Sequence, residues 1–169
     1  YAGYQRNYGA LQSQSAPPYV MNREYYEGPD ESRHYIDPGE HLNHFLYLQG
    51  YWLNGPESLI HARATPDYDD YVGLMFFATT LNAVMSPEAA KPYEVRVTMD
   101  GRPLDASSSG ADIRFDDEGN SYVVVDEPRM YGLVELPEFG GHELTLSSNS
   151  KDFNLFAFTF GAYVTDRDS

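Results

Sequence analysis

Short stretches rich in apolar residues follow one another from about residue 41 onward, and polar turns separate these stretches. The clearest stretch is Tyr93–Met99, whose odd-numbered positions are apolar and whose even-numbered positions are mostly polar. Alternation with a period of two places one set of side chains on each face of a β-strand. Asp100-Gly101 follows directly, and this pair tolerates the positive φ angles that a type I′ turn requires. The pattern therefore predicts a β-hairpin around residue 100.

Further strands are expected at a similar spacing, bounded by Gly, Pro, Asn and Asp. They cover residues 45–52, 57–63, 71–79, 112–115, 121–125, 130–136, 143–147 and 153–164. No stretch of ten or more residues with helical periodicity separates them. Closely spaced short strands are typical of sandwiches and barrels. We predict an all-β fold, a jelly-roll-like β-sandwich of about 8–10 antiparallel strands.

The last strand is apolar on both faces. Phe156, Phe158 and Phe160 share one face, and Phe153 and Leu155 begin the other. A strand of this kind needs cover on both sides. The opposite sheet of a sandwich supplies one cover, and either the N-terminal segment or a neighbouring domain supplies the other.

Residues 1–40 have no period of two or 3.6 and are rich in Gln, Ser, Asn, Pro, Gly and Tyr. Pro17-Pro18 favours extended backbone, and Gly28-Pro29-Asp30 indicates a turn. We predict an extended, Tyr-rich arm or linker from an upstream domain at 1–40, the sandwich at 41–164 and a tail at 165–169. A chain that begins at Tyr1 is expected to be part of a longer protein.

Composition excludes several classes of function. The chain has 11 Lys and Arg against 26 Asp and Glu, and its formal net charge is −15. A negative field repels phosphate backbones and anionic membranes, so no nucleic-acid partner is expected. Cysteine is absent, which excludes disulfides and a CxxC redox pair in this chain. No apolar run reaches the roughly 20 residues of a membrane span, so no direct membrane insertion is expected.

Four histidines, His34, His41, His44 and His61, lie within a short part of the chain. A zinc site needs three or four converging ligands, and an HxxH pair shares a face only in a helix. No helix is expected here, so we interpret these residues as surface or hydrogen-bonded histidines and expect no metal and no cofactor.

Two acidic turns offer oxygen ligands for a structural calcium ion, which is the alternative to a metal-free chain. Their members are Asp67, Asp69, Asp70, Asp116, Asp117 and Glu118. Asp and Asn also occur in turns because their side chains hydrogen-bond the local backbone, and this is the favoured interpretation.

No catalytic motif stands out. The chain lacks a GxSxG elbow and a Gly-rich phosphate loop, and no pair among its 26 acidic residues is singled out for glycoside hydrolysis. We therefore expect no enzymatic activity and no catalytic residue in this chain, and keep a glycoside hydrolase only as a remote alternative.

Aromatic residues are the remaining candidates for a site. Sugar rings stack on exposed aromatic rings, and nearby polar groups bind their hydroxyls. The candidate ligand-binding residues are Tyr51, Trp52, Arg129 and Tyr131. Adjacent residues in a strand point to opposite faces, so one of Tyr51 and Trp52 is expected in the core. Each of the four also has a structural interpretation.

Five segments resemble the C-terminal domain of DipZ-type thioredoxin-family proteins, which are cytochrome c biogenesis proteins. They are YAGYQR at 1–6, LQGYWLNGPESL at 48–59, VRVTMDGRPL at 95–104, VDEPRMYGLVEL at 125–136 and AFTFG at 157–161. The resemblance covers most of the chain and implies a jelly roll of the carbohydrate-binding-module type. It also implies a periplasmic or otherwise extracytoplasmic protein with an upstream thioredoxin-like domain that carries the redox cysteines. It supplies no ligand-binding residue.

Two hypotheses follow for the function. The chain is either a non-catalytic accessory module that binds carbohydrate, or a structural domain that packs on the upstream thioredoxin-like domain or on a second copy as a homodimer. The two apolar faces of the last strand favour a domain that packs against something.

Overall fold

The structure is a computed structural model that describes residues 1–7, 19–89 and 91–161. Its elements are η1 (Arg23–Tyr26), β1 (Ser32–Tyr35), β2 (Leu46–Asn54), β3 (Leu59–His61), β4 (Tyr71–Pro87), β5 (Tyr93–Met99), β6 (Arg102–Pro103), β7 (Arg114–Phe115), β8 (Ser121–Val125), β9 (Arg129–Ser147) and β10 (Phe153–Gly161). The fold is an all-β, jelly-roll-like sandwich, as predicted.

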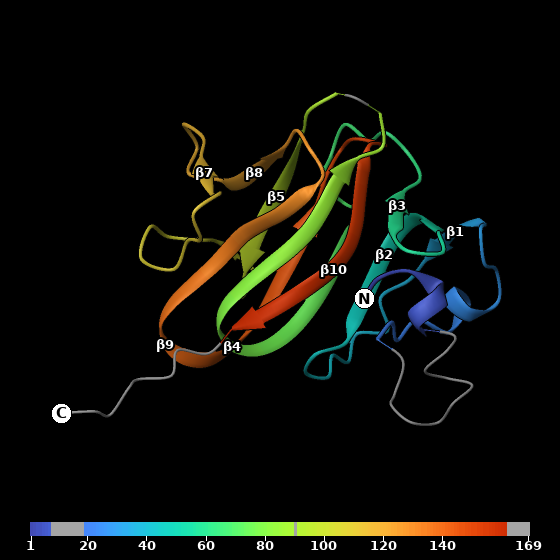
Figure 1. Cartoon of the computed structure of the whole chain (residues 1–169), viewed down its shortest axis with the longest axis horizontal. Coiled ribbons are helices and arrows are strands. Elements are labelled where there is room, and N and C mark those ends of the chain that lie inside the picture. Colours follow the sequence, from blue (N-terminus) through green and yellow to red (C-terminus); the bar gives the residue numbers. More distant parts are fainter. Residues whose placement is uncertain (8–18, 90, 162–169) are drawn as a thin grey trace.

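All strand pairs in the described part of the chain are antiparallel, in the order β1-β2-β3-β10-β4-β9-β5-β8-β7. β6 pairs with β5, and β2 also pairs with β4. Figure 1 shows that β4, β9 and β10 are long, curved strands that run through the middle of the molecule.

The length of β4 and β9 lets both strands contribute to two layers. Residues 71–78 of β4 pair with 140–147 of β9, and residues 80–85 pair with 129–135. β2 and β5 flank the first pair of runs, and β10 flanks the second. The two layers enclose one core, which includes fully buried Trp52, Phe76, Tyr131 and Phe153.

The hairpin predicted around residue 100 is confirmed. β5 has the predicted bounds, and Asp100 and Gly101 have φ angles of 56° and 77°. β8 also has the predicted bounds, and its buried and half-buried residues alternate. Alternating apolar positions thus located β5 correctly, and an apolar run after a polar turn located β8.

Two strands predicted separately at 130–136 and 143–147 form one strand, β9. Residues 136–139 of β9 stand opposite Thr79 alone, so they form a bulge within a continuous strand. A bulge interrupts the alternation of the sequence without ending the pairing. β4 likewise continues past the predicted end at residue 79. The strand predicted at 112–115 is limited to β7, and residues 162–164 of the last predicted strand lie outside the described residues.

The N-terminal segment is built into the fold. β1 pairs with β2 along its whole length. The side chains of Ala2, Val20, Tyr25 and Tyr35 are fully buried in the core. The sandwich therefore includes residues of the segment that was expected to be an arm, which also contains the short helix η1. The domain limits at residues 40 and 164 stay predictions, and the tail at 165–169 lies outside the described residues.

Within the described ranges, no helix has the length and apolar character needed to cross a bilayer.

Candidate functional site

Residues 1–7 and 19–21, which we call the arm, lie in a seam between β2 and β10. β2 and β10 both pair with the edge of β4 that is opposite β9, and β3 joins them at one end only. Ala2 N–H donates to the carbonyl of Phe156 in β10 at 2.8 Å, and Leu46 N–H of β2 donates to the carbonyl of Tyr19 at 2.7 Å. The N-terminal residues thus enter the molecule beside β10 and β2 (Figure 1).

Asn7 ties the two parts of the arm together. Its side chain is fully buried. The side-chain amide of Asn7 donates to the carbonyls of Tyr1 and Gly3 at 3.2 and 2.9 Å. The side-chain oxygen accepts the N–H groups of Tyr19 and Val20 at 2.6 and 2.9 Å. One asparagine therefore fixes Tyr1 relative to Tyr19.

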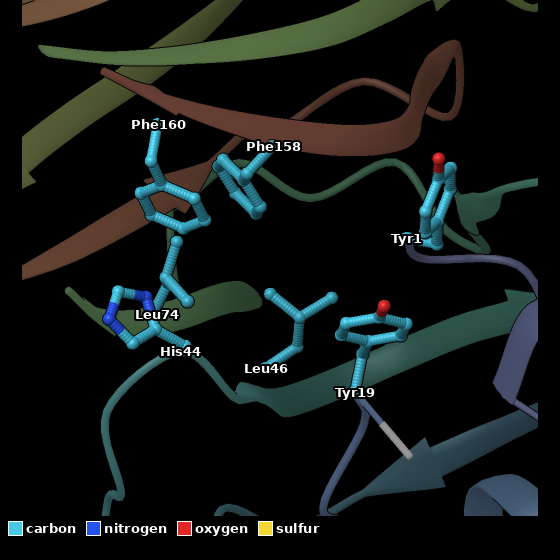
Figure 2. A pocket seen from close by; sticks show the side chains of 7 residues that line it. All are labelled: Tyr1, Tyr19, His44, Leu46, Leu74, Phe158 and Phe160. Atoms are coloured by element: carbon cyan, nitrogen blue, oxygen red, sulfur yellow. The ribbon is translucent and has the colours of Figure 1, made fainter. Parts of the chain in front are cut away.

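An aromatic groove of about 340 Å³ opens in this seam (Figure 2). We call it the seam groove; it is lined by Tyr1, Tyr19, His44, Leu46, Leu74, Phe158 and Phe160. Tyr1 and Tyr19 lie edge to face, with ring centroids 5.8 Å apart. His44 lies edge to face against Phe160 at 5.0 Å. Figure 2 shows the two tyrosines at one end of the groove and the His44–Phe160 pair at the other.

The rings at the rim are accessible. Tyr1 is 49%, Tyr19 37% and Phe160 42% exposed, whereas Leu46 and Leu74 at the base are buried. The groove therefore offers flat aromatic surface over an apolar base, with the tyrosine hydroxyls and the His44 imidazole as hydrogen-bonding groups. Pockets with this combination bind ligands that have both apolar and polar faces.

A second hollow of about 410 Å³ adjoins the seam groove at Tyr1. Gln5, Arg6 and Glu57 line it, together with Phe156 of β10. The Arg6 guanidinium lies 4.5 Å from the centroid of the Tyr1 ring. This hollow adds charged and amide groups beside the aromatic groove.

The segment between β1 and β2 places His44 at the groove. His44 N–H donates to the carbonyl of Met75 at 2.6 Å, and Asn43 forms a bridge with Met75. His44 has a φ of 67°, in the left-handed region that few residues other than glycine adopt. Tertiary contacts therefore hold the His44 backbone against its local preference.

His41 anchors the same segment. Its Nε2 is 2.7 Å from Asp37 Oδ1, its Nδ1 contacts Glu143 Oε1 of β9, and its ring stacks on Tyr47 at 4.0 Å. Burial alone lowers the pKa of His41, but hydrogen bonds to both carboxylates outweigh burial and raise this pKa above its ordinary value. Burial alone raises the pKa of Asp37, but hydrogen bonds from Tyr71, Gly39 and His41 leave it lowered. The site favours an imidazolium between two carboxylates.

The structure separates Tyr51 and Trp52 as expected for neighbours in a strand. Trp52 is fully buried, and its Nε1–H donates to the carbonyl of Gln49 at 2.9 Å. Its ring has no free face for a sugar. Tyr51 is 40% exposed, and Arg63 lies 4.5 Å from its ring centroid. Neither residue lines the seam groove.

Arg129 and Tyr131 hold a loop on β9. Arg129 forms a two-pronged ion pair with Asp112, at 2.9 and 3.2 Å, and lies 3.8 Å from the ring centroid of Tyr131. Tyr131 is fully buried, and its hydroxyl donates to the carbonyl of Glu127 at 2.7 Å. These contacts match the structural interpretation. β2, which carries Tyr51 and Trp52, and β9, which carries Arg129 and Tyr131, do not pair in the described sheet.

The histidines considered as metal ligands lie in different surroundings. His34 packs on Tyr51, His44 lines the groove and His61 contacts Asp70. No three His, Asp or Glu side chains are placed to hold a metal ion in the ranges that the structure describes.

The acidic turns contain local hydrogen bonds of the predicted kind. The side chain of Asp116 accepts the N–H groups of Glu118 and Asn120 at 3.0 and 2.8 Å. Asp70 instead is buried and binds Arg63 and His61, with distances of 2.5 and 2.8 Å. Both arrangements are explained by backbone and ion-pair contacts.

The sequence pointed to part of the groove. Phe158 and Phe160 belong to the last strand, whose two faces were both expected to need cover, and Tyr1 lines the same groove at its other end. His44 was considered only as a metal ligand, and Tyr19 was one of many arm tyrosines. Their meeting depends on Asn7, whose long-range hydrogen bonds leave no periodic signal in the sequence.

Comparisons with known proteins identify a family. No curated protein matches the chain. Among solved structures, it is similar to a family two carbohydrate esterase from Clostridium thermocellum in complex with cellohexaose (17% identity, TM-score 0.44, 62% of this chain and 27% of that chain). It is also similar to a family two carbohydrate esterase from Cellvibrio japonicus (14% identity, TM-score 0.48, 79% and 37%).

The chain spans well under half of either esterase, and likenesses with these TM-scores carry no argument about function. The sequence comparison is decisive for the family, because a family model described as the thioredoxin-like C-terminal domain matches residues 11–161. This chain therefore belongs to the thioredoxin-like C-terminal domain family.

Proposed function

We propose that this chain is a non-catalytic accessory domain of an extracytoplasmic, DipZ-type thioredoxin-like redox protein, and that its seam groove binds carbohydrate. In this proposal the thioredoxin-like domain upstream in the same protein performs the redox chemistry. The accessory domain needs no cofactor and holds that domain near a glycan or a glycosylated substrate. The periplasm is the compartment in which such a protein acts.

The accessible aromatic rings of the seam groove carry the proposal. The C–H face of a sugar ring is apolar and stacks on an aromatic ring, while its hydroxyls need hydrogen-bond partners. Tyr1, Tyr19 and Phe160 offer ring surface around the opening. The tyrosine hydroxyls and His44 offer hydrogen bonds beside that surface. Gln5 and Glu57 in the adjoining hollow can bind a further sugar unit.

Calorimetric titration with soluble oligosaccharides of glucose, N-acetylglucosamine and galactose tests this proposal. We expect at least one neutral oligosaccharide to bind, and Tyr19→Ala to reduce its affinity by about 10-fold or more, because about 60 Å² of apolar contact on a ring contributes about 1.5 kcal/mol at about 25 cal/mol per Å². Tyr51→Ala is the matched control, since Tyr51 is exposed to a similar extent but lies outside the groove.

Two outcomes contradict carbohydrate binding at the groove. One is the absence of binding by every oligosaccharide of the panel to a folded protein. The other is an equal loss of affinity in Tyr19→Ala and Tyr51→Ala, which places the ligand elsewhere or attributes the loss to general destabilisation.

An exposed aromatic pair favours protein interaction as the second candidate function. Phe77 and Phe139 are 45% and 61% exposed, and their rings stack with centroids 6.1 Å apart. They lie at the bulge of β9, away from the residues of the seam groove. This pair can pack on the thioredoxin-like domain or on a second copy of the chain.

Two measurements distinguish these partners. Light scattering after size-exclusion chromatography gives the molar mass, and a homodimer through this pair is expected to dissociate in Phe139→Ser. NMR relaxation of the two-domain protein shows whether this chain and the thioredoxin-like domain tumble together, as packing between them requires. A monomer whose two-domain form tumbles as two independent bodies argues against either interaction.

A further inference from the structure

His41 stands between two carboxylates on different elements. Asp37 lies four residues before it, at the start of the segment that leads to β2, and Glu143 belongs to β9. The side chains of His41 and Asp37 are only 14% and 10% exposed, so water offers little replacement for these contacts. His41 thus links the segment before β2 to β9.

Two carboxylates make opposite demands on a neutral imidazole. A neutral ring has one N–H donor and one lone pair, whereas an imidazolium has two donors. A neutral His41 can satisfy only one of Asp37 and Glu143, and it turns a lone pair toward the other carboxylate. The arrangement in the structure therefore requires the charged form, and loss of the proton breaks one of the two links.

The segment that His41 anchors is short and ends in the seam groove. Only Leu42 and Asn43 separate His41 from His44. Leu42 N–H donates to the hydroxyl of Tyr47, on which the His41 ring stacks. The His44 backbone is held at a positive φ, with its N–H bonded to Met75. The contacts of His41 and the backbone bonds of Asn43 and His44 with Met75 together keep this unfavourable conformation in place.

Other ionisable groups contact His41 or one of its two partners, Asp37 and Glu143. Tyr71 of β4 donates its hydroxyl to Asp37 Oδ2 at 2.5 Å, and Tyr47 of β2 lies against the His41 ring. Asp100, at the turn after β5, accepts the N–H of Glu143 at 2.9 Å. Asp100 also contacts His142 Nδ1 at 2.6 Å.

Glu40 adds another negative charge near Tyr47. Two carboxylates therefore act on His41 directly, Asp37 from the segment itself and Glu143 from β9, and both favour its protonated form.

We propose that His41 is a positioning residue for the seam groove: its imidazolium clasps Asp37 and Glu143, holds His44 against Phe160, and makes ligand binding weaken as the pH rises through the titration of His41. The ligand part of this inference rests on the proposed carbohydrate function. The positioning part concerns the free protein and stands without any ligand.

Histidine NMR of the free chain tests the positioning. In the wild type, the His44 ring signals are expected to show an inflection at the pH where His41 titrates. His41→Gln is expected to remove that inflection and to shift the His44 signals at low pH, because a neutral side chain replaces the clasp. His34→Gln is the control, since His34 is exposed and packs on Tyr51. His44 signals that are the same in His41→Gln and the wild type overturn the proposal.

Glu143→Gln provides a second variant that keeps His41 and removes one charge. It is expected to lower the pKa of His41 and to move the inflection that His41 causes in the His44 signals to lower pH; an unmoved inflection contradicts the clasp. With a bound neutral oligosaccharide, the wild type is expected to lose at least about 5-fold in affinity across the His41 titration. A pH-independent affinity overturns the ligand part, and absence of any binding rejects the proposed function while the His44 signals still decide the positioning.

Discussion

At the scale of single residues, the buried carboxylate of Asp70 explains why glycine stands at position 50. Asp70 is 1% exposed and binds His61 and Arg63. A Cβ on Gly50 would lie 2.0 Å from Asp70 Oδ1. Only glycine fits beside this carboxylate, and Gly50 also has a φ of 97°. The glycine and the buried ion pair therefore depend on one another.

Gly50→Ala is expected to destabilise the chain strongly, because the new methyl group meets the Asp70 carboxylate as well as an unfavourable backbone angle. Backbone strain alone costs about 1–3 kcal/mol. Gly119→Ala is the control, since Gly119 has a φ of 83° but no neighbour within 4 Å of its Cβ position. Urea denaturation should show a larger loss for Gly50→Ala, and equal losses contradict the steric argument.

Asp70 also predicts a dependence of stability on pH. Burial alone raises the pKa of Asp70, but hydrogen bonds from Arg63 and His61 lower it below the ordinary value. A folded-state pKa below the unfolded one gives stability that is present above about pH 4 and is lost as the pH falls through the folded pKa.

Asp70→Asn should lose about 1–3 kcal/mol of unfolding free energy at pH 7, because charged hydrogen bonds are removed. It should also show a weaker decline of stability between pH 5 and pH 2 than the wild type, when urea denaturation is measured at both ends. A variant with an unchanged acid profile contradicts the role of Asp70.

At the scale of elements, alternation located the strands but not the arm. β5 has an unbroken period of two, and β8 is an apolar run that follows a polar turn, so the bounds of both were predictable from the residues. The bulge of β9 and the bend of β4 break the period without breaking the hydrogen bonding, so their continuity was not predictable. The seam groove depends on contacts between residues 1–7, residues 19–21 and β10, which no local pattern encodes.

One side of the seam groove was predictable from the sequence and the other side was not. The apolar face with Phe158 and Phe160 is visible in the sequence of the last strand, and the prediction that it needs cover was informative. The partners on the other side, Tyr19 and His44, come from irregular segments that tertiary hydrogen bonds fix in place. Trp52 and Tyr131 attracted attention as aromatic residues, but they are buried in the core.

Asn7→Ala tests the arm. The substitution removes the hydrogen bonds of the Asn7 side chain with Tyr1, Gly3, Tyr19, Val20 and Tyr26, and leaves the N–H groups of Tyr19 and Val20 unpaired. A loss of about 2–4 kcal/mol in unfolding free energy is expected, from more than one unsatisfied buried group. Gln5→Ala, at an exposed arm position, should change stability little. Equal denaturation midpoints for the two variants would show that the arm does not depend on Asn7.

At the scale of the whole molecule, charge restricts the ligands that the seam groove accepts. The chain has a net charge of −15, and among the residues that the structure describes no acidic or basic side chain other than His44 lines the groove itself. Stacking and neutral hydrogen bonds respond weakly to salt, whereas the overall field repels anions. The seam groove is therefore expected to bind neutral glycans better than acidic ones.

Neutral oligosaccharides are expected to bind better than uronate-containing ones of the same length, and their affinity should change by less than about 3-fold between low and high salt. Calorimetry at two salt concentrations checks both statements. Affinity that collapses in high salt contradicts recognition by the aromatic groove and points to Arg6 in the adjoining hollow as the main contact.

The most direct test of the central claim is an aromatic NMR titration of the chain with a neutral oligosaccharide. The account predicts that the ring signals of Tyr1, Tyr19, His44 and Phe160 shift together with one dissociation constant, while those of Tyr51 stay unchanged. Shifts centred on Tyr51 or on the Phe77–Phe139 pair, or no shifts with any sugar, would contradict carbohydrate binding in the seam groove.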